Sequence, residues 1–292
     1  MSNDEDRIRA LSCWNGSISI AILKGGLSNA NFLVADADGK HVVRFGVDYP
    51  FHQVSREREL MVARAAHAAG FAPRVEFAET GVMVTEFLDA QTFTATDIKV
   101  NPERIGKLLR NFHETMLNHV SGPAYMFWPF HVIRDYLRTL QTHRSDLAQF
   151  LVVATAFEKL QTPLPIVFGH NDLLPANFLD DGKELWLIDF EYAGFGTAMF
   201  DLAGVSSNGL MHPDEKAMLL RAYFGGEPDA NVMRSFAAME CASLLRETLW
   251  GMVSGLFLAA PGVDYDAYTS ENLNRYLASL DAYQNQYGKI VI

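Results

Sequence analysis

Cysteine is scarce in this sequence of 292 residues, which contains only Cys13 and Cys241. The two cysteines lie far apart and lack the spacing of metal ligands, so the sequence argues against a disulfide framework and against a zinc site. A chain with so few cysteines is typical of a reducing compartment, and we expect a cytoplasmic location.

Long hydrophobic runs are also missing. The longest nearly apolar stretch, residues 249–260, is too short to span a bilayer, so we expect a buried helix there and no membrane insertion. Residues 1–7 are acidic and lack the apolar core of a signal peptide. Internal repeats and low-complexity segments are absent, and the pattern is that of an ordinary globular protein.

Basic residues are also fewer than acidic ones. The 24 Lys and Arg residues stand against 35 Asp and Glu residues, which gives a net charge of -11. An acidic chain is a poor general binder of nucleic acid, so we expect no nucleic-acid partner and a small substrate that is cationic rather than anionic. Nothing in the composition indicates an oligomeric state.

The residues that carry chemistry gather in one part of the sequence. Residues 170–177 have the pattern H-x-D-x-x-x-x-N, and the apolar run 187–191 contains a further carboxylate. A phosphoryl-transfer site needs one carboxylate to accept a proton from a hydroxyl, and it needs an amide oxygen and a second carboxylate to hold Mg²⁺ on the nucleotide phosphates. Asp172 fits the catalytic role, and Asn177 and Asp189 fit the metal-binding role.

Each half of this pattern has an ordinary alternative. An Asp five residues before an Asn occurs by chance in many loops, and apolar residues ending in Asp are common at strand ends. His170 is itself a possible base, although in kinase-like loops this position more often supports the loop structurally. The two halves together, a loop acid and amide and then a strand acid, favour a kinase-like site.

The length suits two lobes, which we expect at residues 1–88 and 89–292. Alternating apolar residues predict strands in the first lobe, and the Asp38-Gly39 pair predicts a tight hairpin. Ser55 is expected to cap a helix that ends at Gly70. The expected strands cover residues 17–23, 32–35, 41–45, 74–78 and 82–87.

Several residues of the first lobe are candidates for nucleotide binding. In the loop after the first strand, glycines let the backbone approach phosphates, and polar side chains add donors; these residues are Gly25, Gly26, Ser28 and Asn29. Arg44 stands on the third strand, where a kinase places its phosphate-anchoring cation. Glu59 or Glu57 is expected to pair with it, and we prefer Glu59. Glu86 and Leu88 border a connector whose backbone groups are expected to meet the adenine.

The second lobe reads as mainly helical. Apolar residues at helical spacing predict its helices, which we expect at about 102–116, 131–147, 148–161, 213–224 and 229–260 and in a last segment ending near 287. Asn101 is expected to cap the first of them. Asp201 begins a further helix, and of its two possible roles, capping that helix or bracing the catalytic loop, we favour bracing.

At residues 170–177 and 187–192 the chain resembles the choline/ethanolamine kinase family, within the larger set of aminoglycoside-phosphotransferase-like kinases. Phe200-Asp201-Leu202-Ala203 is similar to the family's next landmark, and Arg44 is found at the same strand position in many members. The resemblance implies an α+β, bilobal protein kinase-like fold, with a small antiparallel sheet lobe and a larger helical lobe. It also implies ATP and Mg²⁺ as cofactors and γ-phosphate transfer to a small alcohol, with Asp172 as the base.

The acceptor is expected to be choline or a similar amino alcohol. Aromatic faces with nearby acids recognise quaternary ammonium groups, and the candidates are Glu191, Tyr192, Glu247, Trp250, Tyr265 and Tyr268. Core packing is an equal alternative for Trp250. Residues 204–208 depart from the aromatic-rich stretch of eukaryotic members, which leaves thiamine, an aminoglycoside or a sugar as alternative acceptors. A non-catalytic nucleotide-binding protein is the alternative from another class.

Overall fold

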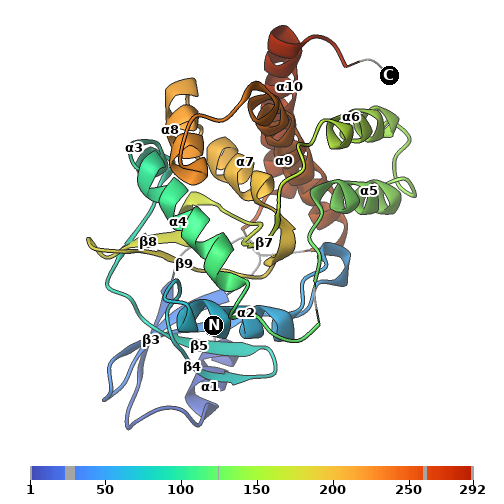
Figure 1. Cartoon of the computed structure of the whole chain (residues 1–292). Helices are drawn as coiled ribbons and strands as arrows, with labels where there is room; N and C mark the ends of the chain where they lie inside the picture. Colours follow the sequence, from blue (N-terminus) through green and yellow to red (C-terminus); the bar gives the residue numbers. More distant parts are fainter. Residues whose placement is uncertain (1, 24–29, 124, 259–261, 291–292) are drawn as a thin grey trace. The chain divides into compact units, whose positions relative to one another are not determined.

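The computed structural model describes residues 2–23, 30–123, 125–258 and 262–290. The chain forms two compact units (Figure 1). The first comprises Met1–Thr92 and Phe178–Glu191, and the second comprises Phe93–Asn177 and Tyr192–Ile292. The sequence predicts a single boundary at residue 88, whereas the chain returns to the first unit at Phe178–Glu191.

Strand pairing explains this return. Residues 91–92 form a short strand that pairs antiparallel with residues 179–180, and the latter strand pairs with residues 185–187. The Leu187 N–H also donates to the Phe71 carbonyl at 2.8 Å. The sheet order is β6-β8-β9, and its strands are β6 (Gln91–Thr92), β8 (Phe178–Asp180) and β9 (Leu185–Leu187).

The main sheet of the first unit is antiparallel throughout, in the order β1-β2-β3-β5-β4. The predicted hairpin joins β2 and β3, where the Asp36 carboxylate accepts the N–H groups of Asp38 at 2.8 Å and Gly39 at 3.1 Å. The strands are β1 (Ser19–Leu23), β2 (Ala30–Ala35), β3 (Lys40–Phe45), β4 (Val75–Glu79) and β5 (Val82–Glu86).

One hydrophobic core holds this sheet together. Alternate residues of β2, β3 and β5 are buried with Ile8 of α1 (Ser2–Ala10). Burying a side chain of this size contributes about 1.5–3 kcal/mol. The unit also contains η1 (Pro50–His52) and α2 (Arg56–Ala68), and the Ser55 hydroxyl accepts the Arg58 N–H at the start of α2 as expected.

The second unit is built around α9 (Ala230–Phe257), a helix buried on most sides from Ser235 to Ser254. It packs against α10, α7, α5 and α6, and Figure 1 shows α9 and α10 side by side. The other elements are α3 (Ala95–Val100), α4 (Pro102–Met116), α5 (Pro129–Leu140), α6 (Ala148–Lys159), β7 (Ile166–Gly169), η2 (Pro175–Asn177), β10 (Gly194–Thr197), α7 (Ala198–Asn208), α8 (Pro213–Phe224) and α10 (Tyr265–Tyr287).

Two helix expectations need correction. The helix expected at 131–147 ends at Leu140, because the next apolar residue is Leu147 and the polar segment between them offers no face to bury. Asn101 does not cap α4 with its side chain; its amide donates instead to the Asp97 carbonyl at 2.9 Å, at the end of α3.

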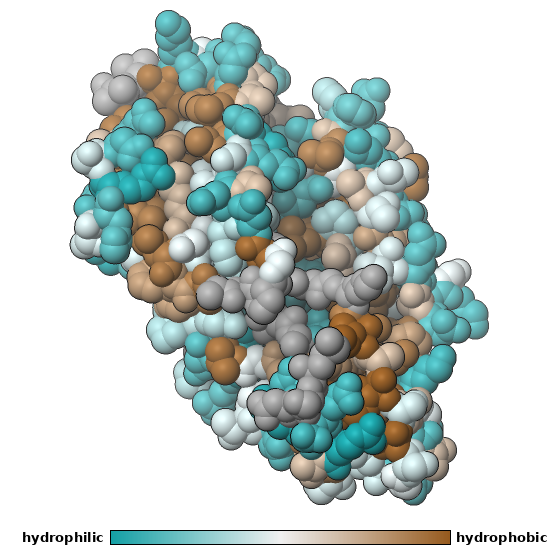
Figure 2. Space-filling view, turned by 180° about the vertical axis from the view of Figure 1, so that it is seen from behind, coloured by the Kyte–Doolittle hydropathy of each residue, from teal (hydrophilic) through white to brown (hydrophobic). Residues whose placement is uncertain are grey.

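Hydrophilic and hydrophobic residues are interspersed over the face shown in Figure 2. Within the described ranges, none of the helices combines the length and the apolar character needed to cross a lipid bilayer. Cys13 and Cys241 are both free thiols, and burial, the largest influence, raises the pKa of the Cys241 thiol to about 12.

Candidate active site

The loop that follows β7 is fixed by the carboxylate of Asp201, in the first turn of α7. This carboxylate accepts the N–H groups of His170 at 2.7 Å and Asn171 at 2.6 Å. Asn171 has a φ of 63°, a left-handed conformation that non-glycine residues seldom adopt outside functional sites. The Asn171 side chain donates to the Tyr192 carbonyl at 3.2 Å, and the loop therefore has one defined path.

Asp201 is held in turn by His113 of α4. With its proton on Nε2, His113 donates to Asp201 at 2.8 Å and accepts the Tyr223 hydroxyl proton at Nδ1, also over 2.8 Å. Burial alone would raise the pKa of the Asp201 carboxyl, but the His113 hydrogen bond and the neighbouring donors outweigh burial and lower that pKa. Asp201 is therefore a fixed anion beneath the loop.

Asp172 follows directly after this braced segment. The Asn177 amide donates to the Asp172 carbonyl at 2.8 Å, which ties the two ends of the loop together. The Asp172 side chain is 13% exposed, and its Oδ1 atom lies 3.8 Å from Nη1 of Arg246. A partly accessible carboxylate at a defined place in a fixed loop is suited to accept a proton from a hydroxyl group.

A buried group of charged and aromatic side chains on α9 lies beside Asp172. Arg246 Nη1 donates to Glu247 at 2.7 Å, and the Tyr268 hydroxyl of α10 donates to the other Glu247 oxygen, also at 2.7 Å. Trp250 Nε1 donates to the Tyr192 hydroxyl at 2.9 Å. Burial, followed by the Glu247 charge, raises the pKa of the Tyr268 hydroxyl well above its usual range.

Gly251 brings the two helices close enough for these contacts. A Cβ at this position would stand 2.5 Å from Thr269 Oγ1 and 3.0 Å from the Tyr268 ring. Any larger residue would push α10 away from α9 and would move the Tyr268 hydroxyl away from Glu247. The predicted substrate residues Tyr192, Glu247 and Trp250 thus meet in one buried cluster, together with Tyr268.

The first unit contains a separate cluster of ion pairs centred on Arg44. Its guanidinium contacts Asp189 at 2.6 Å, Glu59 at 2.9 Å and Glu191 at 3.3 Å. Burial pulls the Arg44 pKa down, but these three carboxylates outweigh burial and raise it. The structure confirms that Glu59, rather than the exposed Glu57, pairs with Arg44.

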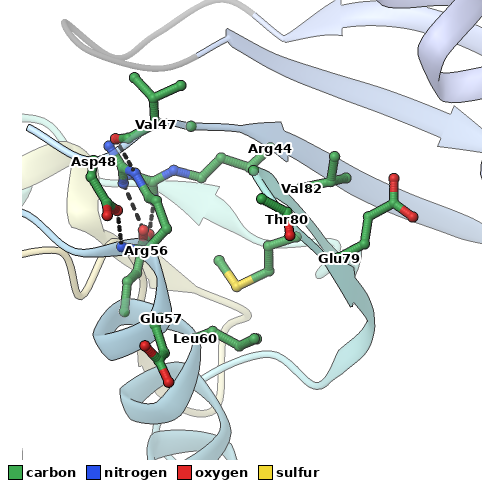
Figure 3. A pocket seen from close by; sticks show the side chains of 13 residues that line it. Arg44, Val47, Asp48, Arg56, Glu57, Leu60, Glu79, Thr80 and Val82 are labelled. Carbon is green, nitrogen blue, oxygen red and sulfur yellow. Dashed lines mark hydrogen bonds and ion pairs between the residues drawn. The ribbon is translucent and has the colours of Figure 1, made fainter.

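Arg56, at the start of α2, completes this cluster. Its Nη1 atom contacts Glu59 at 2.6 Å and Glu191 at 2.9 Å. Its Nε donates to the Val47 carbonyl at 2.8 Å, and Arg56 and Val47 are both labelled in Figure 3. Burial, followed by repulsion from Asp189, raises the pKa of the Glu191 carboxyl. Arg44 and Arg56 also line a cavity of about 570 Å³ on the first unit.

Glu191 had been expected to contact substrate. Its carboxylate is instead bonded by the two arginines of the Arg44 cluster, and its carbonyl accepts from Arg58 at 2.9 Å. The residue is buried. Its side chain is therefore part of the cluster of ion pairs centred on Arg44.

The two predicted metal ligands have suitable donor atoms. Asp189 has a φ of 67°, a left-handed conformation of the kind found at functional sites, and its side chain is 24% exposed. The nitrogen of the Asn177 amide is used for the loop, so the oxygen is the atom that can ligate. Among the described residues, no three His, Cys, Asp or Glu side chains are grouped to hold a metal. Mg²⁺ usually takes one or two protein oxygens and completes its shell with phosphates and water, so the oxygen that each of these residues offers is of a kind that suits Mg²⁺.

The other residues predicted to bind the nucleotide lie between β1 and β2 in the sequence, or at the end of β5 and just after it. Gly25, Gly26, Ser28 and Asn29 lie outside the described residues. The Glu86 N–H donates to the Arg74 carbonyl at 3.0 Å, and its carboxylate accepts the Arg74 N–H at 2.6 Å. The Leu88 carbonyl accepts the Ala90 N–H at 3.0 Å. The backbone donor of Glu86 is therefore used within the sheet, and an adenine contact at these residues stays a prediction.

Sequence reasoning missed two arginines. Arg56 stands three residues before Glu59 in the first turn of a predicted helix, a spacing at which opposite charges pair. Arg246 interrupts an apolar helical tract and is followed directly by Glu247. Buried charges are almost always paired, so a charged pair inside such a tract was a signal of a buried ion pair.

Comparisons with known proteins show the family of the chain. A family model described as "Phosphotransferase enzyme family" matches residues 19–238. A probable ethanolamine kinase from Arabidopsis thaliana is 28% identical over 208 residues, which cover 63% of this chain and 54% of that protein. The chain thus spans about half the length of that relative.

Two solved structures extend the likeness over the whole fold. A choline/ethanolamine kinase family protein from Mesorhizobium loti has a TM-score of 0.78 and 30% identity, over 96% of this chain and 95% of that one. Choline kinase LicA from Streptococcus pneumoniae has a TM-score of 0.76 and 21% identity, over 97% and 99% of the two chains. LicA has also been solved in complex with AMP.

The prediction of an α+β, protein kinase-like fold with an antiparallel sheet and a larger helical part is confirmed. The chain belongs to the phosphotransferase enzyme family and, within it, to the choline/ethanolamine kinase family.

Proposed function

We propose that this protein is an ATP-dependent kinase that transfers the γ-phosphoryl group to the hydroxyl of choline or a similar small amino alcohol. The observation that carries the proposal is the fixed position of Asp172. Its loop is tied by Asn177 and braced by Asp201, and its carboxylate stands beside a buried group of aromatic and acidic side chains. A positioned base next to a pocket for a cation is what phosphorylation of an amino alcohol requires.

Asp172 accepts the proton of the acceptor hydroxyl, whose oxygen then forms a bond to the γ-phosphorus while the bond to the β-phosphate oxygen breaks and ADP leaves. Arg44 binds phosphate oxygens, and Glu59 holds its guanidinium at 2.9 Å. Asn177 and Asp189 hold Mg²⁺, which when bound neutralises charge on the phosphates.

The first unit is then the nucleotide-binding lobe, with Gly25, Gly26, Ser28 and Asn29 near the phosphates and Glu86 and Leu88 near the base. The second unit binds the acceptor through Tyr192, Glu247 and Trp250. We assign Glu191 to the nucleotide lobe, because both Arg44 and Arg56 bond its carboxylate. Two free cysteines support a cytoplasmic location.

A panel of alcohols with a coupled assay for ADP tests the proposal. We expect ATP turnover that depends on an amino alcohol. Turnover with an aminoglycoside, a sugar or thiamine but with no amino alcohol would contradict the assignment of the acceptor. ATP binding without turnover of any alcohol in a broad panel would favour a nucleotide-binding protein that is not a kinase.

A further inference from the structure

Arg246 is an unusual residue to find in a cluster that is proposed to bind a cationic acceptor. Its side chain is 2% exposed, and its guanidinium carbon lies 4.4 Å from the centre of the Tyr192 ring. A cation over an aromatic face at this distance makes a cation–π contact. The protein therefore supplies a cation of its own at an aromatic face expected to bind the substrate.

The guanidinium is held there by few other contacts. Nη1 bonds Glu247 at 2.7 Å, whereas Nε and Nη2 are buried and have no hydrogen-bond partner in the part of the chain that the structure describes. The Tyr192 ring and the Glu247 carboxylate thus fix the position of Arg246, and its Nη1 atom also lies 3.8 Å from Oδ1 of Asp172. A second cation cannot share this ring face, because the two would overlap and would also repel each other.

The other aromatic rings of the cluster pack against one another. Trp250 makes T-shaped contacts with Tyr268 at 5.3 Å and Tyr265 at 6.1 Å between ring centres. A quaternary ammonium has no N–H group and depends on such faces. The ring contacts and Arg246 therefore leave fewer aromatic faces for a quaternary ammonium.

A primary ammonium can be recognised in another way. Each oxygen of the Glu247 carboxylate accepts one bond, from Arg246 at Oε1 and from Tyr268 at Oε2. An ionised carboxylate offers about four lone-pair sites, so acceptor capacity remains for N–H donors. Charge-assisted bonds of this kind are strong and directional.

We propose that Arg246 is a specificity-determining residue: it occupies the cation-binding face of Tyr192 and so makes the enzyme select amino alcohols with a primary ammonium group over those with a quaternary one. This inference rests on the proposed kinase activity. It concerns which amine the acceptor pocket accepts, not how the phosphoryl group is transferred.

The test uses ethanolamine and its mono-, di- and trimethylated derivatives, the last being choline, as acceptors. For the wild-type protein we expect kcat/KM to fall with each added methyl group. In Arg246→Met the Tyr192 face is released, and we expect the KM for choline to fall at least tenfold while kcat changes less. Arg246→Lys keeps a cation in place and is expected to keep the preference for the primary amine.

Arg246→Met leaves the buried Glu247 carboxylate without its cation, and this variant could therefore fail to fold. The double variant Arg246→Met/Glu247→Gln removes both charges and avoids this problem. Thermal unfolding checks all variants. We expect this double variant to prefer choline. Two outcomes would overturn the inference and leave the proposed function standing. One is a wild-type kcat/KM for choline equal to that for ethanolamine. The other is a dependence of kcat/KM on the number of methyl groups that is the same in the wild type and in both Met variants. Absence of turnover with all four amines would instead overturn the proposed function and the inference with it.

Discussion

The carboxylates around Arg44 in the first unit and the carboxylate of Asp201 in the second unit are stabilised in different ways. In the first unit, Arg44 and Arg56 contact Asp189, Glu59 and Glu191, so that charges are balanced by other charges. In the second unit, the carboxylate of Asp201 is satisfied by two backbone N–H groups and by His113. The first arrangement depends on side chains alone, and the second ties a side chain to the path of the backbone.

The difference suits the proposed roles. Ion pairs between flexible side chains can exchange partners, and Arg44 must release Asp189 before it can bind phosphate while Asp189 holds a metal. A loop fixed through its backbone does not rearrange in this way, which suits a base that must meet a hydroxyl in one geometry. We therefore expect substitutions in the second unit to affect the rate of transfer, and those in the first to affect nucleotide binding and stability.

The largest effect is expected for Asp172→Asn, which removes the proton acceptor and keeps the size of the side chain. We expect kcat to fall by roughly 100- to 10,000-fold and ATP affinity to stay within about twofold. Coupled ADP assays and calorimetric titration with ATP measure the two quantities. Asp214→Asn on the exposed start of α8 is the matched control, and a similar loss of kcat in the control would show that the effect is not specific to Asp172.

Arg44→Leu is expected to have the next largest effect. Without Arg44, Glu59 and Glu191 keep Arg56 as their partner, and Asp189 loses its contact with Arg44. Because unpairing buried charges is unfavourable, we expect the free energy of unfolding to fall by about 3 kcal/mol. Nucleotide affinity should fall as well. Denaturant unfolding and ATP titration measure the two losses.

Arg56→Leu is the comparison within the same cluster. It leaves Arg44 in contact with all three carboxylates, so the loss of stability should be smaller, and ATP affinity should change less than in Arg44→Leu. Equal losses of ATP affinity in the two variants would contradict the assignment of Arg44, rather than Arg56, to the phosphates.

The sequence predicted the fold better than it predicted these clusters. The positions of the strands in the first sheet followed from the alternation of apolar residues, and the hairpin between two of them followed from the Asp38-Gly39 turn; both are local signals. Glu59 was preferred over Glu57 as the partner of Arg44 because kinases pair a helix acid with the strand cation, and the structure has this pair at 2.9 Å. The contact of Arg246 with the Tyr192 ring, by contrast, depends on how α9 is buried, and no local pattern specifies which face of a helix that is apolar on all sides will meet a given neighbour.

Asp201→Asn tests the backbone tie of the second unit. The amide nitrogen of the new side chain would face a backbone N–H donor. We expect the free energy of unfolding to fall by about 2 kcal/mol and kcat to fall as well. The pKa of Asp201 is lowered by folding, so its contribution is complete above the usual aspartate pKa and is lost as pH falls through the lower, folded value. The difference in stability between wild type and variant should therefore shrink below about pH 4. A difference that does not depend on pH would contradict the anionic state of Asp201.

Glu191→Gln should give the smallest change and the opposite dependence on pH. The Glu191 pKa is raised by folding, so its contribution to stability is complete below the usual glutamate pKa and is lost as pH rises through the folded value. Relative to wild type, the variant should gain stability, by about 1 kcal/mol, as pH rises above about 4.5. Thermal unfolding at pH 4 to 8 measures this trend, and a trend in the other direction would contradict it.

The most direct test follows the phosphoryl group itself. Phosphorus NMR of the wild-type protein with ATP, Mg²⁺ and ethanolamine should show the γ-phosphate signal replaced by that of a phosphate ester coupled to the CH₂ protons of the acceptor, and Asp172→Asn should leave ATP intact. Release of inorganic phosphate without an ester, or ester formation by Asp172→Asn at the wild-type rate, would contradict the central claim that Asp172 directs transfer to an amino alcohol.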